Sequence, residues 1–206
     1  MPQQLSLFEA DGAEPAVDDL DGLLFGPGHV VSRAQTARVS VLTADAWRAE
    51  ALVTAFAVRG LGGEYNVSRD TEHGLQFVAR TDFCAPLVPL ARRWSPSAAG
   101  KAKAGASKAS EAGAANTRRL TPAGLRLWVI AAGRLTDSGY LLPLAGSEDA
   151  RWSASGAALA ALGLAGVLIG VRGGSPAYRI SSRKRLSRLA ILVGEPPPGA
   201  ALSDWP

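Results

Sequence analysis

Two stretches of this chain predict the same elements in the same order. Each begins with a short apolar helix, continues with an alternating strand and a longer helix, and ends with two strands and a final helix. Self-similarity of this kind predicts duplicated units that pack against each other. In the first stretch we expect helices at 19–28, 46–59 and 83–94 and strands at 36–42, 64–69 and 75–80. In the second we expect helices at 122–132, 153–164 and 183–193 and strands at 140–144, 167–172 and 177–181.

Local signals mark several of these boundaries. Val39 and Val41 alternate with polar neighbours, which is typical of a strand with one buried face. Asp45 is a typical N-cap residue for the helix that follows it, and Thr121 with Pro122 forms a helix start of cap and first-turn proline. Chance similarity between two Ala-rich α/β halves would give the same pattern and is the alternative to duplication.

Charge is unevenly distributed along the chain. The first 31 residues hold six acidic residues and no Lys or Arg, so they carry −6. Because the whole chain carries +4, the remaining residues carry +10. A body this basic favours a polyanionic partner such as nucleic acid. An arginine-rich surface produced by a GC-rich genome is the alternative explanation.

The chain has few residues that could ligate a metal, and its N-terminus lacks the features of a secretion signal. The chain has one cysteine, Cys84, and two histidines, too few for a zinc site of the usual ligand count. We expect no metal and no cofactor. The most apolar run, 154–171, is rich in Ala and Gly and favours a buried helix that runs into a strand over a membrane span. The acidic start lacks the basic region of a signal peptide, which predicts a cytoplasmic, nucleoid-associated protein with no membrane partner.

Composition divides the chain into five segments. Residues 95–120 consist largely of Ala, Gly, Ser and Lys, which is typical of a flexible linker, and their lysines could touch a phosphate backbone without sequence preference. The expected segments are a flexible leader at 1–17, a first repeat at 18–94, the linker at 95–120, a second repeat at 121–195 and a Pro-rich tail at 196–206.

The leader holds one apolar group among polar and acidic residues. Gln4, Leu5, Ser6, Leu7 and Phe8 resemble the short peptide that bacterial replication and repair proteins insert into the sliding clamp, the β subunit ring that encircles DNA. An extended peptide can place Leu7 and Phe8 in an apolar pocket while the Gln4 amide finds a polar partner at its rim. The alternative is an edge strand of the folded body.

The repeated unit is similar to a LAGLIDADG domain. Residues 20–28 fit the nine-residue motif at Leu20, Gly22, Leu23 and Gly28, whereas residues 125–133 keep only the first Leu and the last Gly. The second half, with residues 131–137 and the later strand at 178–180, is more similar to WhiA, an actinobacterial regulator built on a degenerate version of the fold. The resemblance implies an α/β (α+β) protein of two pseudo-symmetric repeats whose antiparallel sheets form a saddle. It also implies a monomer with an internal pseudo-two-fold axis.

In the family, the eighth motif position carries the acid that holds the divalent metal for DNA cleavage. Here that position is Pro27 in the first motif and Ala132 in the second, and neither can ligate a hard cation. We therefore expect the protein to be non-catalytic. An active endonuclease that uses Asp19 or Asp21 is the rival hypothesis.

The saddle that the resemblance implies would lie along duplex DNA. Polar side chains on the outward strand faces, at one motif-helix end and at the start of the last helix suit phosphate and base-edge contacts. We therefore predict a DNA-binding protein recruited to the clamp in replication or repair. A WhiA-like transcription regulator, or an adaptor that binds the clamp alone, is the alternative. The predicted DNA contacts are Arg38, Ser40, Gln76, Arg80, Arg134, Arg172, Arg179, Arg183 and Lys184.

Overall fold

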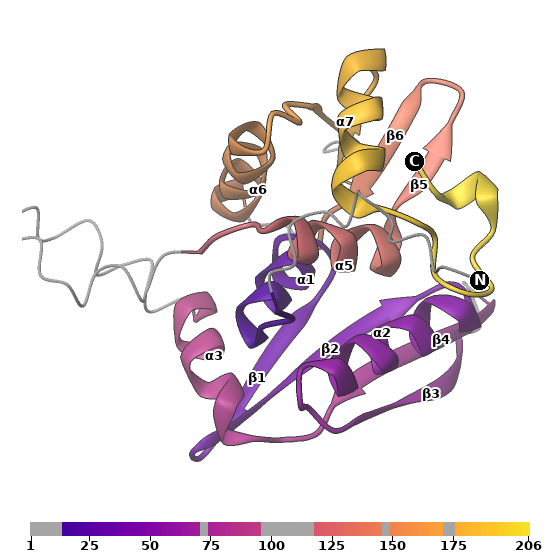
Figure 1. The fold of residues 1–206 in the computed structure, drawn as a ribbon. Helices are drawn as coiled ribbons and strands as arrows, with labels where there is room; N and C mark the ends of the chain where they lie inside the picture. Colours follow the sequence, from indigo (N-terminus) through magenta and orange to yellow (C-terminus); the bar gives the residue numbers. More distant parts are fainter. Residues whose placement is uncertain (1–13, 71–73, 96–117, 146–148, 171–175) are drawn as a thin grey trace, which may run out of the picture.

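The computed structural model describes residues 14–70, 74–95, 118–145, 149–170 and 176–206 (Figure 1). In the first repeat, the helices are η1 (Val17–Leu20), α1 (Asp21–Phe25), α2 (Ala46–Val58), η2 (Ala85–Leu87) and α3 (Val88–Trp94). Its strands are β1 (His29–Arg33), β2 (Thr36–Thr43), β3 (Gly63–Asp70) and β4 (Gly74–Thr81). In the second repeat, the helices are α5 (Pro122–Ala132), α6 (Asp149–Ala161), α7 (Arg183–Val193) and η5 (Leu202–Asp204), and the strands are β5 (Arg134–Thr136), β6 (Gly139–Pro143), β7 (Val167–Ile169) and β8 (Ala177–Ile180).

The two repeats have the same topology. Each forms a four-stranded antiparallel sheet, with strand order β1-β2-β4-β3 in the first and β5-β6-β8-β7 in the second. Identical order in two separate sheets confirms the predicted duplication over chance similarity. The first strand of each sheet, β1 and β5, was not expected from the sequence. Both are short and mostly exposed, so they carry no alternating apolar pattern.

Helices α1 and α5 pack against each other at the centre of the molecule, between the two sheets (Figure 1). Their closest approach is at two glycines, where a Cβ atom built on Gly22 would lie 1.8 Å from the carbonyl oxygen of Gly124. Leu23, Leu24 and Leu125 beside this crossing are fully buried in one hydrophobic core that both repeats share. The crossing therefore requires a residue without a side chain on α1, as the motif in 20–28 predicts.

Ionic contacts hold the N-terminal end of α1. Asp21 is buried and accepts a hydrogen bond of 2.6 Å from the indole nitrogen of Trp94, while Arg93 lies 3.3 Å from the same carboxylate. Burial raises the pKa of Asp21 above its ordinary value, although Trp94 and Arg93 act in the opposite direction. Asp19 forms a second buried ion pair, with Arg59, at 2.8 Å. These carboxylates are therefore parts of the scaffold.

The C-terminal stretch, expected to be a Pro-rich tail, packs on the second repeat. Trp205 is 7% exposed and its indole nitrogen donates to the carbonyl oxygen of Gly194 at 2.7 Å. The Tyr140 hydroxyl donates to the carbonyl oxygen of Asp204 at 2.8 Å. The chain end thus returns to the side of β5 and β6. None of the helices in the described ranges has the length and apolar character that crossing a bilayer requires.

Candidate nucleic-acid interface

The first sheet has one face covered by helix α2 and one open face. Val39 and Val41 of β2 and Phe77 and Ala79 of β4 are buried on the covered side. Residues one position away point to the opposite face because side chains alternate along a strand. The structure therefore places four of the predicted contacts on a single open face, and all four are partly exposed: Arg38, Ser40, Gln76 and Arg80.

Strand register brings these side chains into rows. Ser40 is paired with His29 on one side and with Arg80 on the other, and Arg80 is paired with Glu64 of β3. The guanidinium of Arg80 donates to Glu64 at 2.6 Å, and this hydrogen bond lowers the pKa of the Glu64 carboxyl. Arg80 is thus held in place across the sheet with part of its charge compensated.

Arg38 is held differently. Its guanidinium carbon lies 4.2 Å from the centre of the Phe83 ring, a cation–π contact. Among the described residues, its buried Nε atom has no hydrogen-bond partner. Arg38 is thus positioned by the Phe83 ring and not by a hydrogen bond from its Nε atom.

The open face of the second sheet is smaller and less polar. Arg134 is paired with Leu141, Leu141 with Arg179, and Arg179 with Val167, so the four residues form one row across the sheet. Arg134 is exposed and Val167 is 56% exposed. The structure thus brings Arg134 and Arg179 together on one face, as two cations separated by an apolar side chain.

A buried arginine that the sequence analysis did not select lies between the two sheets. Arg48 of α2 is 5% exposed and reaches the C-terminal end of α5. Its guanidinium donates to the carbonyl oxygens of Val129 at 3.2 Å, Ile130 at 2.8 Å and Gly133 at 2.8 Å. A cation at the negative end of a helix is electrostatically favourable, and here it also donates hydrogen bonds to carbonyls at the end of α5, although Val129 already accepts from the Gly133 amide.

Two carboxylates complete the surroundings of Arg48. Asp45 lies 3.0 Å away and Asp204, from the C-terminal stretch, lies 3.1 Å away. Asp45 is at the N-cap position of α2 as predicted, but its side chain makes no cap hydrogen bond because it binds Arg48. These groups line a cavity of about 300 Å³ that Arg134 and Leu42 also border, so it adjoins residues of β2 and β5. The sequence signal for Arg48 was weak, since an Asp and an Arg three residues apart are typical of an exposed helix face.

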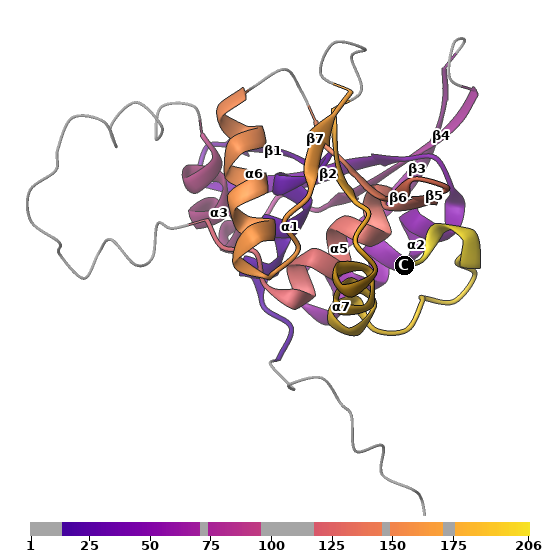
Figure 2. The same cartoon turned by 90° about the horizontal axis from the view of Figure 1, so that it is seen from above.

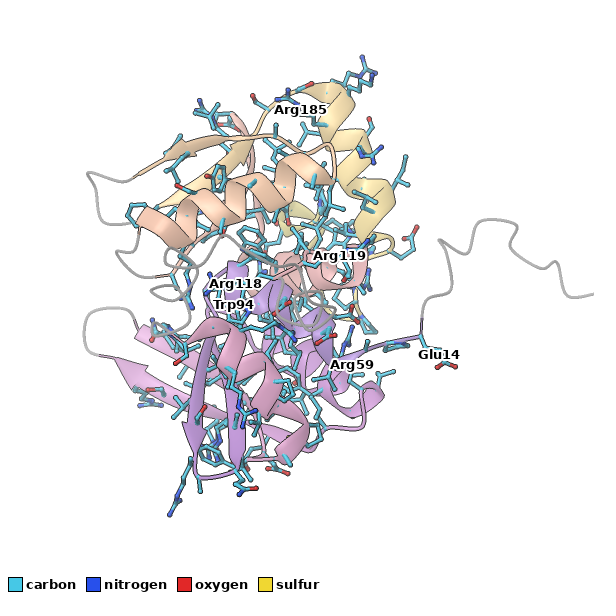
Figure 3. All side chains as sticks on the ribbon, turned by 90° about the vertical axis from the view of Figure 1, so that its left-hand side faces the viewer. Glu14, Arg59, Trp94, Arg118, Arg119 and Arg185 are labelled. Carbon is cyan, nitrogen blue, oxygen red and sulfur yellow. The ribbon has the colours of Figure 1, made fainter. Side chains whose placement is uncertain are left out.

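The remaining predicted contacts lie outside the described residues or on α7. Gln4, Leu5, Ser6, Leu7, Phe8 and Arg172 lie outside the described residues. Arg183 and Lys184 are exposed at the start of α7, which packs on α5. Figure 2 shows α7 with α2 and α5 on the opposite side of the molecule from most of the strands, and Figure 3 shows Arg185 at the far end of the second repeat. The structure therefore does not bring Arg183 and Lys184 together with Arg38 and Arg80.

Comparison with known proteins identifies the architecture. No protein-family model and no curated protein matches the chain. Among solved structures, the chain is similar to the homing endonuclease I-WcaI bound to its DNA recognition sequence, with a TM-score of 0.57 and 12% identity over 85% of this chain and 79% of that one. It is also similar to the N-terminal LAGLIDADG domain of DUF199/WhiA, with a TM-score of 0.51 and 13% identity over 90% of this chain and 86% of that one.

The fold is the two-repeat LAGLIDADG fold. In this LAGLIDADG fold, α1 and α5 take the place of the paired motif helices. Aligning residues 20–28 with 125–133 makes Leu127 the counterpart of Gly22, but the structure packs Gly22 against Gly124. At the crossing the two helices are therefore offset by three residues from this alignment, whereas the strands that follow the motifs, β1 from His29 and β5 from Arg134, keep it. By the offset of the crossing, Val129 is the counterpart of Pro27.

Neither offset places a carboxylate at the motif ends. Pro27, Ala132 and Val129 have no oxygen in their side chains. Asp19 and Asp21, the acids of the rival nuclease hypothesis, lie at the other end of α1 and are buried in ion pairs with Arg59 and Arg93. The described residues hold no group of three or more His, Cys, Asp or Glu side chains that could bind a metal ion.

Proposed function

We propose that this protein binds duplex DNA on the open faces of its two sheets without cutting it. We further propose that its N-terminal peptide recruits it to the sliding clamp in DNA replication or repair, at the nucleoid in the cytoplasm. The observation that carries the proposal is the common orientation of Arg38, Ser40, Gln76 and Arg80 on one uncovered sheet face.

Several features support binding to a polyanion. The residues after position 31 carry +10, and both open faces present arginines at regular strand spacing. Arginine and the polar Ser40 and Gln76 suit phosphate oxygens and base edges. I-WcaI, which shares the fold, is bound to its DNA recognition sequence. A duplex would meet the larger polar face of the first repeat and the two arginines of the second.

The ends of the motif helices support a protein that holds DNA without cleaving it. A divalent metal in a hydrolytic site needs carboxylate ligands. The guanidinium of Arg48 donates hydrogen bonds to the carbonyl oxygens at the end of α5, and its positive charge opposes the approach of a second cation. Asp45 and Asp204 are compensated by this same arginine.

DNA binding is tested with the double variant Arg38→Glu/Arg80→Glu. A matched control, Arg183→Glu/Lys184→Glu, makes the same change of charge on the opposite side. We expect the first pair to weaken binding to a labelled duplex by at least about tenfold and to reduce the slope of log affinity against log salt, because each lost phosphate contact removes about 0.9 from it. The control pair should change both quantities little. Equal losses in the two variants would reject the open face as the DNA-binding surface.

Nuclease activity is tested separately. Incubating the wild type with supercoiled plasmid and Mg²⁺ or Mn²⁺ should give no nicking, and nicking that Asp21→Ala abolishes would favour the nuclease.

Clamp recruitment is tested by pull-down on immobilised sliding clamp. Leu7→Ala/Phe8→Ala should abolish retention because these side chains supply the apolar contacts of the peptide. The neighbouring variant Pro2→Ala/Gln3→Ala serves as control and should be retained like the wild type. Retention of both variants would reject residues 4–8 as the clamp-binding peptide and leave the DNA proposal standing.

A further inference from the structure

An apolar groove lies on the helix side of the molecule, away from the open sheet faces. It has a volume of about 610 Å³ and runs between α2, α5 and residues 195–198. Ala51, Ala55 and Val58 form one wall and Leu127 and Ile130 the other. Val58 is 60% exposed, so this wall presents apolar surface to solvent.

Two arginines fix the ends of the groove. Arg59 donates to the carbonyl oxygen of Ala55 at 2.8 Å and to that of Ala16 at 3.1 Å, which ties the end of the leader to α2. Arg126 of α5 donates to the carbonyl oxygens of Val193 and Glu195, which positions the residues that follow α7. The groove is therefore pre-formed, and its shape does not depend on an occupant.

The C-terminal end of the leader lies at the groove. Pro15 is itself one of the lining residues, and Arg59 holds the adjacent Ala16 (Figure 3). Pro15 lies seven positions after Phe8, which allows a reach of up to about 25 Å. The only large apolar side chains between the start Met and Pro15 are Leu5, Leu7 and Phe8. The groove thus adjoins the segment whose chemistry matches it.

We infer that the peptide Gln4–Phe8 docks into this groove of its own chain and is thereby withheld from other partners. Its Leu and Phe side chains cover the apolar walls, and the groove's polar rim, Glu50 and Glu195, faces the polar residues of the peptide. Because the peptide is tethered, its effective concentration at the groove is about 1 mM. An intrinsic dissociation constant of about 0.1 mM would then leave about one chain in ten with a free peptide.

The consequence for the clamp rests on the proposed function. If the same peptide binds both sites, the groove and the clamp compete for it. The full chain should bind the clamp about tenfold more weakly than a synthetic peptide of residues 1–13. The peptide must then leave the groove before it can bind the clamp.

Disulfide trapping tests the docking without the clamp. In a Cys84→Ser background, Ser6→Cys is combined with Thr54→Cys, an exposed position on the same helix as the groove wall. We expect an intramolecular disulfide that forms about tenfold faster than in a control pair, Ser6→Cys with Ser68→Cys, where the second position lies in β3. Adding Leu7→Ala/Phe8→Ala to the first pair should remove this advantage. Equal rates in all three chains would overturn the inference, and so would disulfides that join two chains.

The second test uses variants that block the groove. Ala55→Trp should slow the trapping to the rate of the Leu7→Ala/Phe8→Ala chain and should raise clamp affinity about tenfold. Val58→Asp, at an exposed position, is expected to do the same and covers the case in which Ala55→Trp fails to fold. Trapping that neither variant slows would overturn the inference. A chain that traps as expected but never binds the clamp would reject the proposed recruitment and keep the groove.

Discussion

Helices α1 and α5 occupy equivalent places in the two repeats but differ in almost every contact. Helix α1 spans five residues and α5 spans eleven. At the crossing both have a glycine, whereas one turn later Gly26, the residue that follows α1, meets Trp128 of α5. A duplicated fold thus keeps the packing that the crossing needs, while the side chains around it diverge.

Their C-terminal ends show the difference most clearly. The end of α1 is capped across the repeats by a hydroxyl, since Ser155 of α6 donates to the carbonyl oxygen of Phe25 at 2.9 Å. The end of α5 is capped by the guanidinium of Arg48 from α2, which also binds two carboxylates. In both cases the capping residue comes from the longer helix of the other repeat. The interface between the repeats is therefore maintained by different capping groups at matching positions.

The largest difference should appear at the crossing glycines. Gly22→Ala puts a methyl group 1.8 Å from a backbone oxygen, so the helices must separate, and we expect a loss of at least about 3 kcal/mol in the free energy of unfolding. Gly124→Ala meets its nearest atom at 2.9 Å and gains up to about 1 kcal/mol of helix propensity, so its net loss should be smaller. Urea unfolding monitored by circular dichroism measures both. Equal losses would contradict the asymmetric crossing.

The two helix caps should differ by a smaller amount. Arg48→Met removes the donors of three carbonyls and leaves Asp45 and Asp204 without their cation, so we expect a loss of about 3 kcal/mol. Ser155→Ala removes one hydrogen bond from Phe25 and should cost about 1 kcal/mol. Both variants are compared by denaturant unfolding at neutral pH. A cost for Arg48→Met no greater than that for Ser155→Ala would show that the guanidinium adds little to the interface.

Much of the fold could be predicted from the sequence because the elements are locally specified. The alternation at Val39 and Val41 gave β2, and Thr121 caps α5 as expected, with its hydroxyl accepting from the Gly124 amide at 2.9 Å. Strands β1 and β5 could not be predicted from apolar alternation, because neither strand has a buried face. They are strands because they pair in hairpins with β2 and β6. The offset between α1 and α5 was also missed, because a motif shows which residues are small and not which of them meet.

The candidate interface was predicted in part for the same reason. Strand alternation was sufficient to place Arg38 and Arg80 on one face. Arg48 was missed because its partners, Ile130 and Asp204, are distant in sequence and become neighbours only when the repeats pack. Arg183 was assigned to the DNA surface from its charge and its position at the start of a helix, and neither indicates on which side of the molecule that helix lies.

The smallest expected effect concerns the first turn of the two helices, where Asp21 of α1 corresponds to Ala123 of α5. Burial raises the pKa of Asp21, so at a pH between the unfolded and folded values the folded chain keeps a proton that the unfolded chain has lost. Stability therefore falls as the pH rises through this window and stays lower above it. Asp21→Asn keeps an oxygen that accepts from Trp94 and removes the titration, although it leaves Arg93 with Asp18 as its remaining carboxylate. Unfolding measured from pH 3 to pH 7 should thus show the variant gaining on the wild type as the pH rises. A difference that is independent of pH would mean that Arg93 and Trp94 compensate the buried charge in full.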